Sequence, residues 1–388
     1  MKNFTFYNPT KVIFGEGTIE QIGAELSSRD HKKILFLYGQ GSIKRNGVYD
    51  TIINSLNENK IEFVELDGVK PNPVLTKVHE AVALCKEHKL DTILAVGGGS
   101  VIDSAKAIGA GALYDGDIWD AFEGTIRVKE SLPIFTILTI SATGSEMNTN
   151  SVVTKENEDK KWPMLTGPCS YPVVSIMDPK VQAELPISQT INGAVDAIAH
   201  IMEFYFDGSP NTDVQDEFSE GMIRTVIKHS KILLADPTNY ESRSQLMWVA
   251  TLALNGVISS GTKGGDWATH MLEHSLSAFY DVAHGAGLAI MFPAWMKYVH
   301  EDNIAKFAQF GERVFGINEG SDEVKAVNSI YAIESFFKEI GAPTRLTDIN
   351  VSENDLEKLA DNASMKGALG SVKKLERNDL LEIYKLAF

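Results

Sequence analysis

The sequence predicts an α/β N-terminal domain, with a Rossmann-like parallel sheet and helices on both faces, followed by an all-α C-terminal domain. Continuous apolar runs alternate with helical patterns in the first half, two of these runs end in glycine-rich turns, and the second half shows only helical periodicity. The 388 residues are enough for two hydrophobic cores. Long helices begin after Leu185-Pro186-Ile187-Ser188, so we expect domains at 1–185 and 186–388.

The first half alternates strand and helix patterns. A strand buried on both faces appears as a continuous apolar run, and Lys33–Tyr38 has this pattern after its first residue. Phe4–Phe14 fits an edge strand that could pair with another subunit, which predicts a homodimer. The polar segment Lys155–Pro163 fits a surface hairpin. Further strands are expected at Ile61–Leu66, Thr92–Val96 and Ile134–Leu138, and helices at Tyr49–Asn59, Val74–His88 and Val101–Ala112.

The second half carries helical patterns only. Ser188 is the expected N-cap of a helix that runs to about Phe206, because its hydroxyl can accept a hydrogen bond from a first-turn N–H. Later helices are expected at Asp213–Leu234, Tyr240–Ser259, Trp267–Phe279, His284–Tyr298, Asn303–Phe310, Asp322–Ile340, Glu353–Asn362 and Asn378–Ala387.

Two glycine-rich turns follow expected strands, where open parallel sheets bind ligands. They are Gly39-Gln40-Gly41-Ser42 and Gly97-Gly98-Gly99-Ser100. Glycines let backbone N–H groups approach a phosphate, and the next helix adds positive partial charge. Neither turn completes G-x-G-x-x-G, because Lys44 and Ile102 occupy the third glycine positions. The alternative is a pair of tight turns without a ligand, with Asp103 capping its own helix.

Lys44 and Arg45 follow the first turn, and Gly39 stands where an acidic residue would bind the ribose of NAD. A small residue with nearby cations suits a 2′-phosphate, so the sequence favours NADP(H) over NAD(H). Simple solvation of both cations is the alternative. The hydroxyls of Thr139 and Thr143 could bind phosphate or amide groups, although such residues also cap loops without any ligand.

Histidines concentrate in the second half. Asp196 and His200 are four residues apart and therefore lie one turn apart on one helical face. His270, His274 and His284 offer further imidazoles for a divalent metal, although any one of them could be a structural histidine. Spacing does not choose between His270 and His274, which share a face. Fe²⁺, Zn²⁺ and Mn²⁺ all suit such a ligand set.

These motifs together resemble the iron-containing, or group III, alcohol dehydrogenases, in particular butanol dehydrogenases and broad-range aldehyde reductases. The resemblance runs nearly end to end and is carried by Tyr38 to Gly47, Pro71-Asn72-Pro73, Gly97 to Asp103, Thr139 to Glu146, Asp196 to His200, and His270 to Gly285. It implies hydride transfer between NAD(P)(H) and short aliphatic alcohols or aldehydes such as butanol and butanal, with Fe²⁺ as the first choice of metal acting as a Lewis acid.

The resemblance also implies residue roles. The metal ligands would be Asp196, His200, His270 and His284, so that Asp196 and His270 serve catalysis through the ion. His274 would lie beside the nicotinamide and relay a proton. Dinucleotide contacts are implied for Gly98, Gly99, Ser100, Asp103, Thr139 and Thr143, for Asn72, Gly39, Gly41, Ser42 and Lys44 near the adenosine end, and for Lys161, although Lys160-Lys161-Trp162-Pro163 departs from the family's pattern around this lysine.

Composition excludes several classes of function. The formal net charge of −16 opposes nucleic acid or an anionic membrane as partner. The partner that the resemblance implies is a small alcohol or aldehyde. Two cysteines are too few for a disulfide framework, which favours the cytoplasm. The main alternative function is a dehydroquinate-synthase-like, metal- and NAD-dependent lyase. A metallohydrolase would not need the glycine turns, and a non-catalytic nucleotide-binding or scaffold protein would not consume NAD(P)H with butanal.

Overall fold

The computed structural model describes residues 1–388, apart from the side chain of Leu165. The chain forms two compact units. The first contains Tyr7–Leu185 with Pro237–Thr251, and the second contains Met1–Phe6, Pro186–Asp236 and Leu252–Phe388. The chain thus passes from the first unit to the second between Leu185 and Pro186. Two segments, Met1–Phe6 and Pro237–Thr251, belong to the opposite unit, so the expectation of two contiguous domains is wrong for them.

Distant packing partners explain both exceptions. The N-terminal amino group donates to the carbonyl of Pro210 at 3.0 Å, and Lys2 N donates to Gly261 O at 2.7 Å, so Met1–Phe6 belongs with the helices. The segment Pro237–Thr251 belongs with the sheet instead. Its Thr251 hydroxyl donates to the Glu146 carboxylate, and its Trp248 packs edge-on against Phe14 at 6.2 Å. No local periodicity signals contacts of such sequence separation.

The first unit is built on a six-stranded parallel sheet in the order β1-β8-β5-β4-β2-β3. Tyr38 at the end of β2 pairs with Val96, and Gly97 at the end of β4 pairs with Leu138 at the end of β5. The carboxyl ends of β2, β4 and β5 are therefore level, and the turns that follow them lie at one edge of the sheet. The strands are β1 (Lys11–Phe14), β2 (Lys33–Tyr38), β3 (Glu62–Leu66), β4 (Thr92–Gly97), β5 (Ile134–Leu138) and β8 (Val174–Met177).

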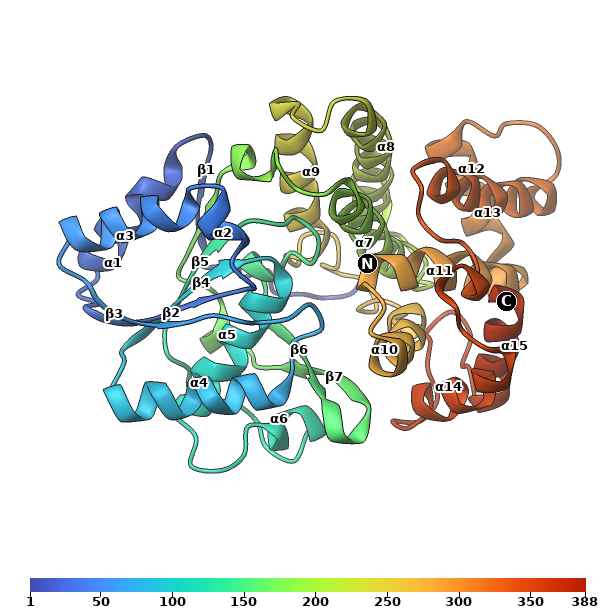
Figure 1. The fold of residues 1–388 in the computed structure, drawn as a ribbon. Coiled ribbons are helices and arrows are strands. Elements are labelled where there is room, and N and C mark those ends of the chain that lie inside the picture. The colour runs from blue at the N-terminus through green and yellow to red at the C-terminus, as the bar shows by residue number, and fades with distance from the viewer. The chain divides into compact units, whose positions relative to one another are not determined.

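Helices cover both faces of this sheet, as the sequence predicts (Figure 1). Alternate residues of β2 face opposite cores: Ile34 and Phe36 pack with α1 and α3, whereas Leu35 and Leu37 pack with α4 and α5. Leu94 of β4 lies in the first core and Ile93 in the second. The helices are α1 (Ile22–Ser27), α2 (Ser42–Arg45), α3 (Val48–Glu58), α4 (Leu75–His88), α5 (Gly99–Ala112) and α6 (Trp119–Glu123).

Two strand predictions need correction. The strand expected over Phe4–Phe14 is only Lys11–Phe14, because Met1–Phe6 packs in the other unit. It is an end strand of the sheet, and the homodimer expected through this edge stays a prediction. The hairpin expected at Lys155–Pro163 is longer, with β6 (Asn150–Lys155) antiparallel to β7 (Lys160–Leu165).

The second unit is helical throughout, as expected. Its first helix begins at Ile187 with Pro186 as N-cap, and no side chain of the described residues caps it, so the prediction for Ser188 is wrong. The helix expected to reach Ser259 ends at Ala253, before Gly256 with φ +98°. The helices are α7 (Ile187–Tyr205), α8 (Asp213–Ala235), α10 (Ala268–Tyr280), α11 (His284–Val299), α12 (Ile304–Phe315), α13 (Asp322–Glu339), α14 (Leu356–Ala363) and α15 (Arg377–Ala387), while α9 (Tyr240–Ala253) packs largely in the first unit. Among the described residues, no helix is both long and apolar enough to cross a membrane.

A fully buried lysine lies in the first unit. The Lys106 ammonium on α5 donates to Ser145 Oγ at 2.7 Å, to Asn148 Oδ1 at 2.9 Å and to the carbonyl of Asn150 at 2.8 Å. Burial lowers the pKa of Lys106 from 10.5 to about 8, although the nearby carboxylate of Asp103 favours the charged form. Lys106 thus ties the segment after β5 to α5.

Lys106→Met should destabilise the protein more at high pH than at neutral pH. Between pH 8 and 10.5 the unfolded chain keeps the lysine proton while the native chain releases it, so the wild type gains stability as pH rises and the methionine variant does not. The difference in unfolding free energy between the two proteins should grow by about 1–2 kcal/mol from pH 7.5 to 9.5. Urea unfolding at both pH values measures it, and an unchanged difference would show that the native pKa is not lowered.

Candidate metal centre and nucleotide-binding turns

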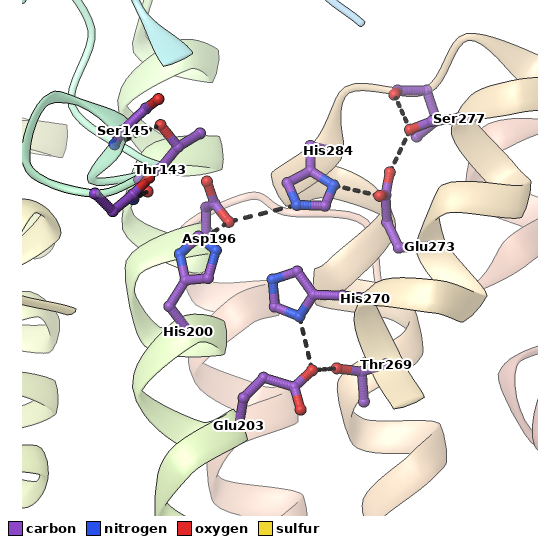
Figure 2. A network of polar contacts seen from close by, with 12 residues as sticks. Thr143, Ser145, Asp196, His200, Glu203, Thr269, His270, Glu273, Ser277 and His284 are labelled. Atoms are coloured by element: carbon purple, nitrogen blue, oxygen red, sulfur yellow. Dashed lines mark hydrogen bonds and ion pairs between the residues drawn. The ribbon is translucent and has the colours of Figure 1, made fainter. Parts of the chain in front are cut away.

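The candidate metal centre lies within the helical unit. On α7, one helical turn brings His200 Nδ1 to 3.5 Å from Asp196 Oδ1. From the start of α11, His284 directs Nε2 toward the same oxygen at 3.7 Å. His270 enters from α10, with its ring centroid 4.8 Å from that of His200 and 5.3 Å from that of His284. Figure 2 shows the four side chains converging.

The donor atoms of this cluster suit a cation. Asp196 Oδ1, His200 Nδ1 and His270 Nε2 are buried and have no hydrogen-bond partner among the described residues. Leaving one such group unsatisfied costs about 1–3 kcal/mol, so three together need an explanation. Burial lowers the pKa of His200 to about 3, which keeps the imidazole neutral and its lone pair available. One carboxylate and three neutral imidazoles are a normal ligand set for a divalent transition metal.

A second group of potential ligands overlaps the first. Ligand atoms of Glu273, His274 and His284 lie within 4.8 Å of one another, as do those of Asp196, His270 and His284. Both oxygens of Glu273 are engaged, however, one with His284 Nδ1 and the other with the Ser277 hydroxyl. Because both oxygens of Glu273 are engaged, whereas Asp196, His200 and His270 each offer a buried atom without a hydrogen-bond partner, the first group fits an ion better. The His274 ring lies 5.6 Å from that of His284.

The glycine turn after β4 packs closely against the segment after β5. A Cβ on Gly99 would lie 2.4 Å from Thr143, so the two turns are in close contact and no side chain fits between them. Thr139 N donates to Gly97 O at 3.0 Å, which fixes the segment after β5 beside the same turn. Helix α5 begins at Gly99, and Ser100 lies in its first turn. The positive end of the α5 dipole therefore lies at this glycine turn, which is what the expected phosphate contact requires.

Asp103 does not cap its own helix. Its carboxylate accepts from Ser145 Oγ at 2.5 Å and from Val152 N at 2.9 Å, and no side-chain cap of α5 is present among the described residues. The capping expectation is therefore wrong. Asp103 and Lys106, both on α5, bind the same Ser145 hydroxyl. Asp103 therefore helps Lys106 to hold the segment after β5 against α5.

The turn after β2 contains a contact that the sequence did not reveal. Lys44 Nζ lies 3.0 Å from Glu65 Oε1 and over the rings of Tyr38 and Tyr49, at 5.1 and 4.8 Å. The hydroxyl of Tyr38 also donates to Glu65. These partners raise the pKa of Lys44. The cation expected for a 2′-phosphate is thus already paired with a carboxylate.

The remaining expected coenzyme residues occupy varied settings in the first unit. Gly41, with φ +90°, immediately precedes Ser42 at the start of α2. Asn72 adopts a left-handed conformation, with φ +52°, in the segment before α4. Lys161 is buried on β7 and pairs with Thr154 of β6. Nothing in these positions by itself assigns a coenzyme contact, so the roles of Ser42, Asn72 and Lys161 stay predictions.

A parallel-sheet unit with glycine turns and a helical unit with an aspartate–histidine cluster define a class of protein, the metal-dependent dehydrogenases that use a nicotinamide coenzyme. The chain belongs to the iron-containing alcohol dehydrogenase family. Residues 9–179 match the family "Iron-containing alcohol dehydrogenase", and residues 190–388 match "Fe-containing alcohol dehydrogenase family, C-terminal". It is thus an oxidoreductase, and its fold class and family agree with those expected from the sequence.

Similar proteins cover the whole chain. The "Probable NADH-dependent butanol dehydrogenase 1" of Bacillus subtilis is 44% identical over 99% of both chains. The "NADPH-dependent aldehyde reductase YqhD" of Escherichia coli is 36% identical over 99% of this chain and 95% of its own. The crystal structure of NADH-dependent butanol dehydrogenase A from Thermotoga maritima superposes with a TM-score of 0.97 at 52% identity, covering 100% of this chain and 99% of its own. These relatives do not favour the dehydroquinate-synthase-like alternative.

Proposed function

We propose that this enzyme reduces short aliphatic aldehydes such as butanal, and oxidises the corresponding alcohols, with one divalent ion held by Asp196, His200, His270 and His284. The observation that carries the proposal is that ligand atoms of Asp196, His270 and His284 lie within 4.8 Å of one another, with His200 beside them, and that buried atoms of Asp196, His200 and His270 have no hydrogen-bond partner. Named relatives that are butanol dehydrogenases and an aldehyde reductase support the substrate class.

Each residue of the cluster has a different chemical role. When bound, the ion supplies a Lewis acid that polarises the carbonyl, and the nicotinamide supplies the hydride. Asp196 provides the anionic ligand, and the three imidazoles provide neutral nitrogen ligands that leave room for the substrate oxygen. His274, one helical turn after His270 on α10, holds the proton that the product alcohol requires. We propose Fe²⁺ as the resident ion, because the family descriptions name iron.

The coenzyme preference is proposed as NADP(H) over NAD(H). In its favour, Gly39 brings no carboxylate that would repel a 2′-phosphate. Two observations oppose it: Glu65 pairs with Lys44, and the relatives at 44% identity are named NADH-dependent. A 2′-phosphate would therefore have to compete with Glu65 for the ammonium of Lys44.

The proposed activity is tested by adding butanal to the purified, metal-loaded enzyme with NADPH or NADH and following coenzyme absorbance. Consumption of the coenzyme, lost after chelation of the metal and restored by Fe²⁺, supports the proposal. Absence of turnover with butanal and other linear aldehydes under both coenzymes would refute the substrate class.

Gly39→Asp should shift the coenzyme preference toward NADH. A carboxylate there would accept hydrogen bonds from a ribose hydroxyl and repel a 2′-phosphate, and space exists because a Cβ on Gly39 would meet no atom closer than Val69 O at 3.5 Å. We expect the ratio of kcat/KM for NADPH over NADH to fall by at least about tenfold, since about 1.4 kcal/mol suffices. A wild-type enzyme that already prefers NADH strongly, or a ratio unchanged by the substitution, would contradict the assignment of Gly39.

A further inference from the structure

We propose that Glu203 and Glu273 are positioning residues that hold the His270 and His284 imidazoles with Nε2 as the lone-pair nitrogen facing the ion. The inference rests on the proposed metal site and deepens it, because it concerns residues that bind the histidines rather than the ion. It is carried by two carboxylates that contact the two histidines in the same way from different helices (Figure 2).

Glu203 holds His270. Its Oε1 accepts from His270 Nδ1 at 2.7 Å and from the Thr269 hydroxyl, and its Oε2 accepts from the backbone N–H of Trp267. The side chain is 1% exposed. Both oxygens are thus fixed to the first turn of α10, so the carboxylate cannot rotate away. Trp267, held in a left-handed conformation with φ +63°, also packs edge-on against the His270 ring at 5.1 Å.

Glu273 holds His284 in the same manner. One oxygen accepts from His284 Nδ1 and the other from the Ser277 hydroxyl, and the side chain is fully buried. Gly287 on α11 makes room for it, since a Cβ there would lie 2.7 Å from Glu273 Cγ. The close approach of α11 to a buried carboxylate is therefore built into the backbone. It leaves His284 Nε2 directed at Asp196 Oδ1, 3.7 Å away.

The contact between each carboxylate and its histidine fixes the tautomer of the imidazole ring. A carboxylate offers only acceptors, so each Nδ1 must carry the hydrogen and each Nε2 must keep its lone pair. Such carboxylate–histidine–metal arrangements orient the ring and make the nitrogen a stronger ligand, and their loss typically costs 10–100-fold in metal affinity. The anionic charge of Glu203 and Glu273 also adds to that of Asp196, and a divalent cation compensates part of this buried negative charge.

The test uses full-length enzyme stripped of metal and titrated with Zn²⁺ in competition with a chelator, with Co²⁺ absorption as a report on the ligands. Glu203→Gln and Glu273→Gln keep the size of each side chain and an acceptor oxygen, but remove the charge. Each should weaken Zn²⁺ binding by about 10–100-fold, while the Co²⁺ spectrum keeps the form of the wild type because the four ligands are unchanged.

Glu220→Gln is the matched control. Glu220 is a fully buried carboxylate of the same helical unit, but it accepts from the Tyr205 hydroxyl at 2.8 Å rather than from a histidine. Its variant should bind Zn²⁺ within about twofold of the wild type, which separates the histidine contact from the general cost of removing a buried charge.

Three outcomes overturn one or the other proposal. Zn²⁺ affinity of both glutamine variants within twofold of the wild type would refute the positioning role alone. A Co²⁺ spectrum of Glu273→Gln that shows one coordinating oxygen lost while His284 stays bound would make Glu273 a ligand, which also refutes it. A wild type that binds no stoichiometric ion would instead refute the proposed metal site.

Discussion

Asp196→Ala should remove the bound divalent ion and lower kcat/KM for butanal by about 10³-fold or more, since Lewis-acid stabilisation contributes several kcal/mol to such reactions. Asp196 is the one carboxylate in the proposed ligand set, and its side chain lies in contact range of both His200 and His284. Without it, three neutral imidazoles would have to hold a doubly charged ion in a buried site. Metal content by elemental analysis and steady-state kinetics measure the two effects.

A surface variant of the same unit provides the control. Glu217 on α8 is exposed and forms a solvent-exposed ion pair with Arg313 at 3.1 Å, so Glu217→Ala should leave metal content and turnover unchanged. If the Asp196→Ala variant keeps a full equivalent of metal and more than about a tenth of wild-type activity, Asp196 is not a metal ligand.

Gly285→Ala should disrupt the metal centre without changing any ligand. A Cβ on Gly285 would lie 2.1 Å from the carbonyl oxygen of Asn192, so α11 and α7 meet there backbone to backbone. The residue before it is His284, and Asn192 lies one turn before Asp196 on α7. Alanine must push the helices apart and move His284 away from Asp196. We expect a loss of about 1–3 kcal/mol in unfolding free energy together with weaker Zn²⁺ binding.

Gly221 supplies the comparison for this substitution. It is also a helical glycine of the second unit, on α8, but a Cβ there would meet nothing closer than Arg224 Nη2 at 3.8 Å. Gly221→Ala should therefore be neutral or stabilising, because alanine favours the helix. Urea unfolding and chelator competition on both variants measure the contrast. Equal stability and equal Zn²⁺ affinity of the two would show that the close approach at Gly285 does not position His284.

Local patterns were sufficient for most of the elements. Lys33–Tyr38 and Ile134–Leu138 form strands with the expected bounds, because residues buried on both faces give an unbroken apolar run. Asp196 and His200 fall on one face of α7, because a spacing of four residues is one helical turn. Helix ends were less well predicted, as Ser188 shows, since capping depends on where the chain enters the helix.

The sequence by itself determined the class of fold, the family and the types of residue available to a metal, because periodicity, glycine turns and histidine spacing are local properties. Spacing left His270 and His274 on one helical face and only the resemblance assigned them different roles, whereas the tertiary structure shows that the His270 ring approaches that of His200. Only the tertiary structure paired Lys44 with Glu65 and assigned Met1–Phe6 to the helical unit. Each of these contacts joins residues distant in sequence, and backbone packing rather than local propensity decides which distant residues meet.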